Sequence, residues 1–200
     1  MYPTTIKNLI ECFKKFPGIG EKSAERMALA TLNLDENVIK IFEQSLIDSK
    51  TKICRCKICN NLSENELCNI CSDKTRDNKT ICVVENIKNI IAIEKTNCYH
   101  GVYHVLDGLI SPLDGKNPND INIQSLFDRV DNDDINELIM ALTPSVEGET
   151  TTLYISKKLE NKNIKISKIA HGVPLGADME YIDGLTLEMA LENRKNISDK

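Results

Sequence analysis

Four cysteines in the middle of the chain constrain its fold more than any other feature of the sequence. They form two Cys-x-x-Cys pairs with eight residues between them, at Cys56, Cys59, Cys68 and Cys71. Each pair turns back on itself so that two thiolates converge, and two pairs complete a tetrahedron around zinc. Four incidental buried cysteines are the alternative, and this spacing disfavours it. We expect one structural Zn²⁺ per chain in a compact knuckle with no open position for catalysis.

The other four cysteines lack ligand spacing. Cys54 is too close to Cys56 for good chelation, so we treat it as a bystander. Cys12, Cys82 and Cys98 stand among apolar residues, which predicts small core or half-buried side chains. The first residues lack the apolar centre of a secretory signal, and no apolar run reaches the roughly 18–20 residues of a membrane helix. We expect a cytoplasmic chain whose clustered thiols are reduced and bind metal.

Charge is distributed unevenly along the 200 residues. The net charge of −5 argues against a generally sticky nucleic-acid binder. Residues 1–55, however, carry nine Lys and Arg against seven Asp and Glu, and the rest of the chain is strongly acidic. Any contact with nucleic acid is therefore expected at the N-terminal end.

The N-terminal part is predicted to be helical. Apolar residues at helical spacing favour helices over Ile6–Phe16, Ser23–Leu34 and Glu36–Leu46. The first is ended by a Pro-Gly-Ile-Gly turn at residues 17–20. The segment from Phe16 to Arg26 reads FPGIGEKSAER, which has the form of a helix-hairpin-helix motif.

This hairpin is predicted to bind DNA phosphates. Gly18 and Gly20 allow a tight turn and a close approach to a phosphate, which then faces free N–H groups at the start of the second helix, near Ser23. Lys22 and Arg26, four residues apart, lie on one helix face and reach adjoining phosphates without reading sequence. An ordinary turn with a solvated basic face is the alternative. Because one motif covers few phosphates, a single copy predicts that the chain dimerises through this end.

Beyond a charged, uncompensated stretch at Lys74–Lys79, where we place a domain boundary, the pattern changes to alternating strands and helices. This alternation predicts an α/β domain with a mainly parallel sheet covered on both faces. The expected strands are Ile81–Val84, Val102–Leu106, Glu137–Leu142 and Ile164–Ala170. The expected helices are Ile87–Ile93, one around Leu126–Val130, Thr150–Glu160 and a closing Thr186–Arg194.

Three glutamates in this part are candidate site residues. Glu85 follows the first strand of the α/β part, and Glu147 and Glu149 lie between a strand and a helix. If the two strands are neighbours, these carboxylates form a cluster with oxygen ligands for Mg²⁺. Alternatively, Glu147 and Glu149 only favour the helix N-terminus through its dipole. The histidines, His100, His104 and His171, have no ligand spacing and are expected to be loop or strand residues.

Taken together and in order, these segments resemble the RecR family of bacterial recombination mediator proteins across nearly the whole chain. The hairpin and the cysteines are each shared with other families, whereas the later strings are specific to this one. The later strings are Val83–Glu85, Gly101–Leu106, Ser111–Gly115, Thr143–Thr150 and Ala170–Gly176.

The resemblance implies a Toprim fold for the α/β part, and a ring-shaped dimer or tetramer that encircles DNA through paired hairpin ends and exchanged C-terminal segments. It implies partnership with RecO, and in some lineages RecF, in displacing single-strand-binding protein and loading RecA at gaps, without catalytic turnover. Lys22 and Arg26 carry over as DNA contacts, and Glu85 and Glu147 as Toprim acids that contribute to partner binding.

The expected division is a helix-hairpin-helix domain at 1–53, a four-cysteine zinc knuckle at 54–76, a Toprim domain at 77–172 and a C-terminal oligomerisation segment at 173–200. We expect the knuckle to be a rigid joint, because zinc ties together a stretch too short for its own core. Two positions depart from the family: Thr143 replaces a usual Asn, and Asp107 replaces a usual Gly, which adds a carboxylate near the acidic face.

A Mg²⁺-dependent Toprim nuclease or primase-like enzyme is the competing interpretation. Such enzymes hold their metals with an additional Asp-x-Asp pair at the end of a later strand. Here that place reads Leu-Thr-Pro-Ser at residues 142–145, and the acidic run Asp131–Asp134 lies before the strand. We therefore favour a non-enzymatic clamp.

Overall fold

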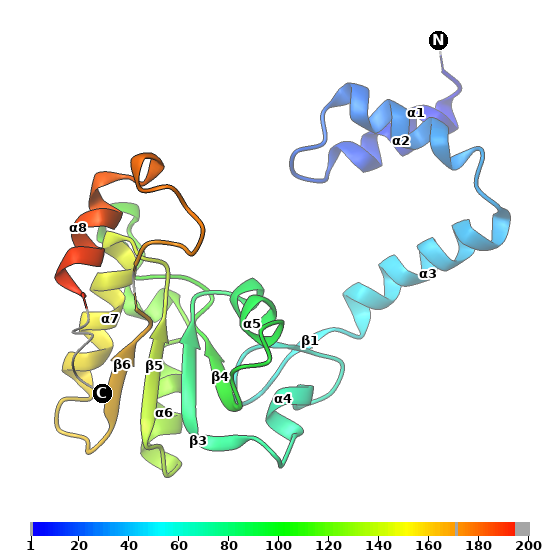
Figure 1. Ribbon diagram of the computed structural model, residues 1–200. Coiled ribbons are helices and arrows are strands. Elements are labelled where there is room, and N and C mark those ends of the chain that lie inside the picture. The colour runs from blue at the N-terminus through cyan, green and yellow to red at the C-terminus, as the bar shows by residue number, and fades with distance from the viewer. Residues whose placement is uncertain (1, 171, 195–200) are drawn as a thin grey trace. The chain divides into compact units, whose positions relative to one another are not determined.

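The computed structural model describes residues 2–170 and 172–194 (Figure 1). Its contacts divide the chain into two compact units, Met1–Ile53 and Cys54–Lys200, which are described separately. Among the helices in these described ranges, none is long and apolar enough to cross a membrane.

The first unit contains three helices, α1 (Thr4–Lys14), α2 (Glu21–Thr31) and α3 (Glu36–Thr51). The predicted helices are confirmed, although α2 begins two residues earlier than expected and α3 runs five residues further. A small core joins α1 to α2, where two alanines permit close approach. It consists of Ile6, Ile10, Phe13, Ala24 and Ala28.

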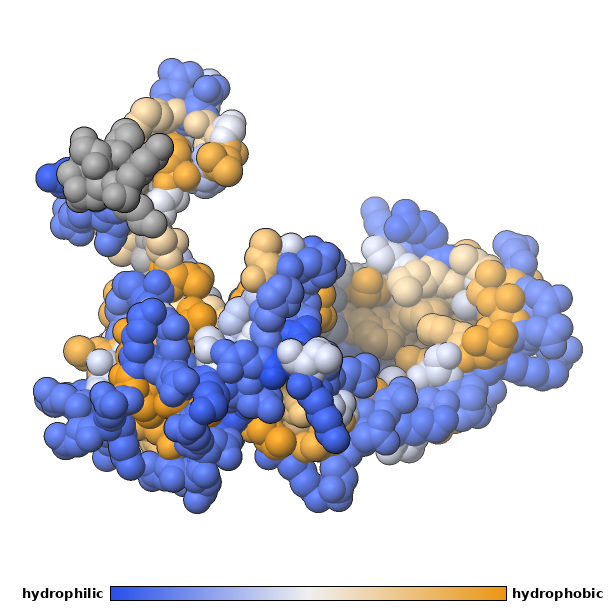
Figure 2. Space-filling view, turned by 60° about the horizontal axis from the view of Figure 1, so that its bottom comes forward, coloured by the Kyte–Doolittle hydropathy of each residue, from blue (hydrophilic) through white to orange (hydrophobic). Residues whose placement is uncertain are grey.

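Helix α3 has no buried residue. Asp35 caps its N-terminus by accepting a hydrogen bond from the Asn37 N–H at 2.8 Å. Its large apolar side chains are exposed, at Val38, Ile41, Phe42, Leu46 and Ile47. Figure 2 shows hydrophobic patches on this unit at the right of the view.

The second unit begins with the cysteine knuckle. Strands β1 (Cys54–Arg55) and β2 (Leu62–Ser63) pair antiparallel, and the four-residue helix α4 (Asn69–Ser72) follows. The turn between the strands is sharp, because Asn60 adopts a left-handed conformation with φ of 62°.

The remainder forms a four-stranded sheet that is parallel throughout, where a mainly parallel sheet was predicted. Its strands are β3 (Asp77–Val84), β4 (Gly101–Val105), β5 (Glu137–Ala141) and β6 (Lys165–Lys168), in the order β4-β3-β5-β6. Val84 pairs with both Val105 and Ala141 in the register, so the C-terminal ends of these three strands lie at one edge.

Helices cover both faces of the sheet (Figure 1). On one face, α6 (Gln124–Asn132) and α7 (Val146–Lys158) contribute Leu126 and Ile155 to the main core. On the other, α5 (Ile87–Glu94) contributes Ile90, which packs with Val84 and Tyr103. Helix α7 begins four residues earlier than predicted, because Ser145 caps it by accepting from the Gly148 N–H.

The charged stretch Lys74–Lys79 is not uncompensated. The Arg76 guanidinium forms an ion pair with Glu94 at 2.5 Å, and Lys79 forms one with Asp134 at 2.5 Å. Strand β3 already begins at Asp77. The knuckle thus belongs to the same compact unit as the sheet, and the finer four-part division stays a prediction.

The prediction of core or half-buried side chains is wrong for two of the three scattered cysteines. Cys82 is buried in β3, but Cys12 and Cys98 are exposed. Cys12 lies on the outer face of α1, and the Cys98 thiol donates to the Thr96 carbonyl at 3.2 Å in a turn. Local apolar neighbours in the sequence did not decide which side of the element faced the core.

The C-terminal part leaves the sheet after β6 and ends in helix α8 (Gly184–Glu192). Several of its apolar side chains are exposed: Leu175, Met179, Tyr181, Leu185 and Leu191. His171 and residues 195–200, which belong to the predicted C-terminal features, lie outside the described residues.

Candidate zinc centre, DNA-binding hairpin and acidic site

The four predicted zinc ligands converge. Cys56 and Cys59 lie in the turn after β1, Cys68 caps α4, and Cys71 lies within α4. All four Sγ atoms lie within 4.8 Å of one another. Across residues 2–170 and 172–194, this is the only group of three or more ligand-type side chains close enough to hold one ion.

The chemistry of this donor set fits zinc. The hydrogen bond with Cys68 raises the pKa of the Cys59 thiol, so crowding disfavours simultaneous ionisation of the thiols unless a cation compensates. The Cys68 N–H donates to Cys56 Sγ at 3.3 Å, which holds two of the four sulfur-bearing residues together. Cys56, Cys59 and Cys68 are buried and Cys71 is half-buried, as expected of a closed structural site.

Cys54 does not join this group. Its thiol is exposed and lies 3.3 Å from the carbonyl oxygens of Ser63 and Asn65. This is the place expected for a bystander.

The knuckle covers an edge of the sheet. Strand β4 is an edge strand, and its Val105 N–H donates to the Cys59 carbonyl at 2.9 Å. The Asn60 side chain donates back to the Val105 carbonyl at 3.2 Å. Ile70 of α4 packs against the cores on both faces. Unpaired edge groups are a liability, so the knuckle contributes to the stability of the α/β fold as well as to its own.

The hairpin forms the turn that the sequence predicts. Gly18 has φ of 80°, in the left-handed region where glycine is favoured. Gly20 has an ordinary φ of −85°, and a Cβ atom there would meet nothing within 4 Å, so the fold of the chain itself does not require glycine at this position.

The start of α2 is open. Gly20 is its N-cap residue and makes no side-chain capping hydrogen bond. Glu21, the first residue of the helix, forms an ion pair with Lys14 of α1 at 2.7 Å, which offsets its negative charge. Lys22 and Arg26 are exposed, Ser23 is half-buried, and the buried Ala24 faces α1. Residues two positions apart lie about 200° around a helix, so the basic pair faces away from the core.

The acids predicted in the α/β part are only partly brought together. Glu85 and Glu147 line one cavity of about 280 Å³ at the C-terminal ends of β3 and β5, and the Thr143 hydroxyl donates to the Glu85 carboxylate. Sequence reasoning did not include Asp114 and Lys116, which also line this cavity. The sequence signal that could have identified them is the tight turn predicted by Ser111–Gly115, which brings this loop back to the C-terminal ends of the strands.

Glu149 lies apart from this cavity. It forms an ion pair with Lys168 of β6 at 2.9 Å and lines a different, largely apolar cavity between α7 and α8. For Glu147, hydrogen bonds from the Glu147 backbone N–H and from the Ser145 side chain lower the pKa of the carboxyl group. This favours the interpretation that Glu147 suits the helix N-terminus.

Asp107 does not simply add charge to the acidic face. Its carboxylate forms an ion pair with Arg55 of the knuckle at 2.9 Å. Its φ of 59° is left-handed, a conformation that glycine adopts with least strain.

Neither described histidine takes part in a site. His104 of β4 is fully buried, and burial lowers its pKa to about 4. Its Nε2 atom lies 2.9 Å from the Asn122 carbonyl oxygen. His100 lies in the loop before β4, as predicted.

These parts define a class of protein: a helix-hairpin-helix unit followed by a four-cysteine zinc knuckle built onto a Toprim-like α/β domain. Comparison with known families matches each part in the same order. The matches are the RecR helix-hairpin-helix at residues 6–49, the RecR four-cysteine zinc finger domain at 53–73, the Toprim domain at 79–170 and the RecR C-terminal region at 172–195.

The chain belongs to the RecR family. It is 47% identical over 193 residues to Recombination protein RecR of Staphylococcus aureus strain Newman, covering 96% of this chain and 98% of that protein. The same values hold for Recombination protein RecR of the S. aureus strains USA300 / TCH1516 and USA300. The family resemblance, the Toprim fold and the structural zinc expected from the sequence are thereby confirmed.

Proposed function

We propose that this chain is a non-enzymatic recombination mediator that binds DNA and acts with RecO, and in some settings RecF, to load RecA at single-stranded gaps. The observation that carries the proposal is the open N-terminus of α2, with two exposed basic side chains one helical turn apart. Curated relatives named as recombination proteins, similar over nearly their whole length, support it.

Phosphate binding at the hairpin follows from helix chemistry. The first N–H groups of a helix lack intrahelical acceptors, and the positive end of the helix dipole attracts anions. With Gly20 as the N-cap residue, no capping side chain occupies this position, and the absence of a Cβ leaves room for a phosphate. Lys22 and Arg26 would then contact adjoining phosphates, which positions DNA without sequence specificity.

Assembly through the N-terminal unit is supported by α3. Four of its exposed apolar residues, Val38, Ile41, Phe42 and Leu46, recur at helical spacing along one stripe, and a monomer gains nothing by exposing such a stripe to water. Pairing of two copies would cover the stripe and supply a second hairpin. The exposed apolar residues of the C-terminal part support exchange of that segment in a larger ring.

We place the partner-binding contribution at the acidic cavity, with Glu85 and Glu147 as its principal acids. Both line the same cavity, which also holds the exposed side chains of Asp114 and Lys116. The contribution of Glu149 is expected to be smaller, because it is paired with Lys168. A weak Mg²⁺ site remains part of the proposal for this cavity, and a cytoplasmic location is part of it for the whole chain.

The experiment that tests the proposal uses gapped DNA coated with single-strand-binding protein. We expect the chain, together with its RecO-type partner, to speed RecA filament assembly, and to produce no strand cleavage or nucleotide polymerisation with Mg²⁺. A Toprim enzyme would instead show one of these activities and lose it in Glu85→Gln. That second result would overturn the assignment as a non-enzymatic mediator.

A further inference from the structure

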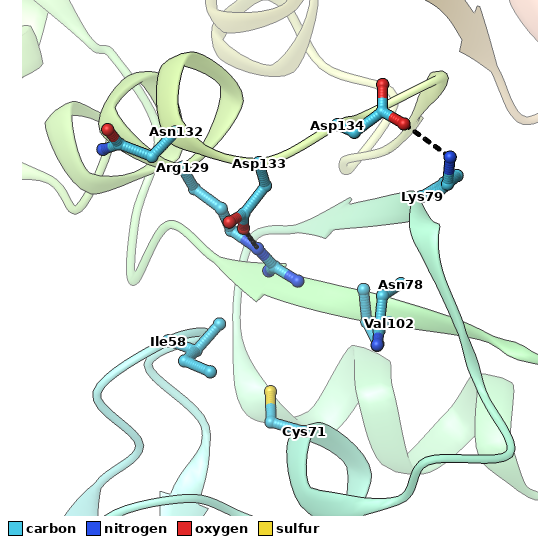
Figure 3. A pocket seen from close by; sticks show the side chains of 9 residues that line it. All are labelled: Ile58, Cys71, Asn78, Lys79, Val102, Arg129, Asn132, Asp133 and Asp134. Carbon is cyan, nitrogen blue, oxygen red and sulfur yellow. Dashed lines mark hydrogen bonds and ion pairs between the residues drawn. The ribbon is translucent and has the colours of Figure 1, made fainter.

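A cavity of about 470 Å³ lies between the zinc knuckle and the N-terminal ends of β3 and β4, away from the acidic site. Its lining residues come from four elements that are distant in sequence (Figure 3). Ile58 and Cys71 of the knuckle and Val102 of β4 form part of its wall. The volume is in the range of small-molecule sites.

The most unusual group in this cavity is the Arg129 guanidinium of α6. Its side chain is only 8% exposed. Nη1 donates to the Tyr103 carbonyl at 2.8 Å, whereas Nε is buried without a hydrogen-bond partner. The nearest carboxylate oxygen, from Asp133, lies 3.6 Å from Nε, beyond hydrogen-bond distance. Figure 3 shows the Arg129 side chain running from α6 toward the middle of the lining residues, with Asp133 beside it.

Buried donors of this kind need an acceptor, because an unpaired polar group away from water is costly. A simple anion is a poor candidate. Arg129 and Lys79 are matched in charge by Asp133 and Asp134, so the ionisable side chains of the lining sum to zero. Zinc bound by four thiolates, including Cys71, adds negative charge to the wall. An incoming anion would therefore meet like charges with no unmatched cation.

A neutral group with a donor next to an acceptor fits better. It would accept from the Arg129 guanidinium and donate to the Asp133 carboxylate. The Watson–Crick edge of an unpaired nucleobase has this alternation, and unstacked bases are read at that edge by proteins that bind single strands. Asn78 and Asn132 add amide groups to the rim, and Ile58 and Val102 supply apolar surface for the ring.

We propose that the Arg129–Asp133 cavity binds one unpaired nucleobase, splayed out from single-stranded DNA. The inference rests on the proposed function in one respect, namely that single-stranded DNA is what the chain encounters. It adds a base contact to the phosphate contacts at the hairpin, and it predicts a preference for unpaired over duplex DNA at this cavity.

The test uses the zinc-loaded full chain and a free nucleoside, 2-aminopurine 2′-deoxyriboside, whose fluorescence reports binding. We expect saturable quenching that unmodified deoxynucleosides compete away. Asp133→Ala should weaken binding about tenfold, the loss expected for one charge-assisted hydrogen bond. Arg129→Lys should do the same, because lysine keeps the charge but loses the planar fork.

Asp131→Ala is the matched control. Asp131 lies in the last turn of α6, two residues before Asp133, and pairs with Lys162 at 2.7 Å. Its side chain does not line the cavity. This variant should bind the nucleoside like the unmodified chain. Thermal unfolding of each variant separates lost binding from lost folding. Asp133→Ala is the deciding variant, since Arg129 also supports β4 through Tyr103.

No saturable quenching, or equal binding by Asp133→Ala and Asp131→Ala, would overturn the inference. So would tighter binding of inorganic phosphate by Asp133→Ala together with competition by phosphate, which would identify an anion site. The double variant Lys22→Ala, Arg26→Ala should bind the nucleoside normally. Failure of the hairpin proposal is thereby distinguished from failure at this cavity.

Discussion

The Thr143 hydroxyl donates a hydrogen bond to the carboxylate of Glu85, and so joins the ends of β5 and β3 through their side chains. These strands are neighbours, with Val84 opposite Ala141. The orientation of Glu85 is therefore fixed from within the chain. The resemblance to the RecR family implies Asn at this position, and Thr143 keeps a hydrogen-bond donor there in a shorter side chain.

The acidic cavity gives a prediction that separates the three glutamates. Glu85→Gln and Glu147→Gln should each weaken binding of the RecO-type partner by about 1 kcal/mol, or roughly fivefold, as expected for charges at an interface rim. Glu149→Gln is the control and should have a smaller effect, because Glu149 lines another cavity and pairs with Lys168. Titration by surface plasmon resonance measures all three. Equal effects would remove the cavity from the partner site.

The zinc centre gives a prediction about stability. Cys56→Ser should abolish stoichiometric zinc and lower the free energy of unfolding by more than about 3 kcal/mol, since metal loss is among the largest single-site effects. The loss should extend to the sheet, because the knuckle covers the edge of β4 through Cys59. Metal analysis and amide exchange at β4 measure both effects.

Cys98→Ser is the control for this experiment. Cys98 is exposed in a turn and is not a ligand, so zinc content and β4 protection should be unchanged. Similar zinc loss in both variants would contradict the ligand assignment.

The ion pair between Arg76 and Glu94 predicts a pH dependence. The Arg76 hydrogen bond, more than that from Tyr103, holds the pKa of Glu94 below its usual value of 4.5. A folded-state pKa below the unfolded one stabilises the fold above that usual value, and this stabilisation is lost as pH falls through the folded pKa. At neutral pH, Glu94→Gln should therefore cost about 1–3 kcal/mol, because it removes the carboxylate nearest the Arg76 guanidinium, which keeps the Gly101 carbonyl at 3.1 Å and Asp73 at 3.9 Å.

Urea unfolding of both proteins across acidic pH measures this effect. The difference between them should shrink below pH 4.5, and zinc release common to both cancels in the comparison. Tyr103→Phe removes only one hydrogen bond to Glu94, so it should lower the free energy of unfolding by less than Glu94→Gln does. A difference that does not change with pH would show that Glu94 acts through packing alone.

The exposed stripe of α3 predicts self-association. Ile41, 66% exposed, lies within this stripe, so Ile41→Glu should convert the assembly toward monomers at micromolar concentration. Gln44→Glu is the control: it adds the same charge to α3 at a polar position, so the mass of the assembly should be that of the unmodified chain. Light scattering measures both. A monomeric unmodified chain, or equal masses for the two variants, would contradict assembly through this helix.

Much of the fold was predictable because local patterns determine it. The Cys-x-x-Cys spacing identifies the zinc ligands, and the apolar runs identify four parallel strands. Element ends were less predictable, since caps decide them: Ser145 begins α7 four residues early and places Glu147 and Glu149 inside the helix. Glu147 lines the acidic cavity with Glu85, whereas Glu149 does not and instead pairs with Lys168 of β6, which is distant in sequence.

The Arg129–Asp133 cavity was not predictable from sequence. Arg129 is one of many charged residues in a polar segment, and only tertiary packing buries its guanidinium against Tyr103. The compensation of Lys74–Lys79 has the same origin, because Glu94 and Asp134 come from distant elements. Pairs of this kind leave no periodic signal in a single sequence.

The salt dependence of DNA binding tests the central claim most directly. Single-stranded DNA affinity would be measured over a range of salt concentrations for the unmodified chain and for Lys22→Ala, Arg26→Ala. Removing two phosphate contacts per hairpin should weaken binding similarly for all sequences and make the slope of log affinity against log salt shallower by about one to two. An unchanged slope with unchanged affinity would show that the hairpin is not the DNA site.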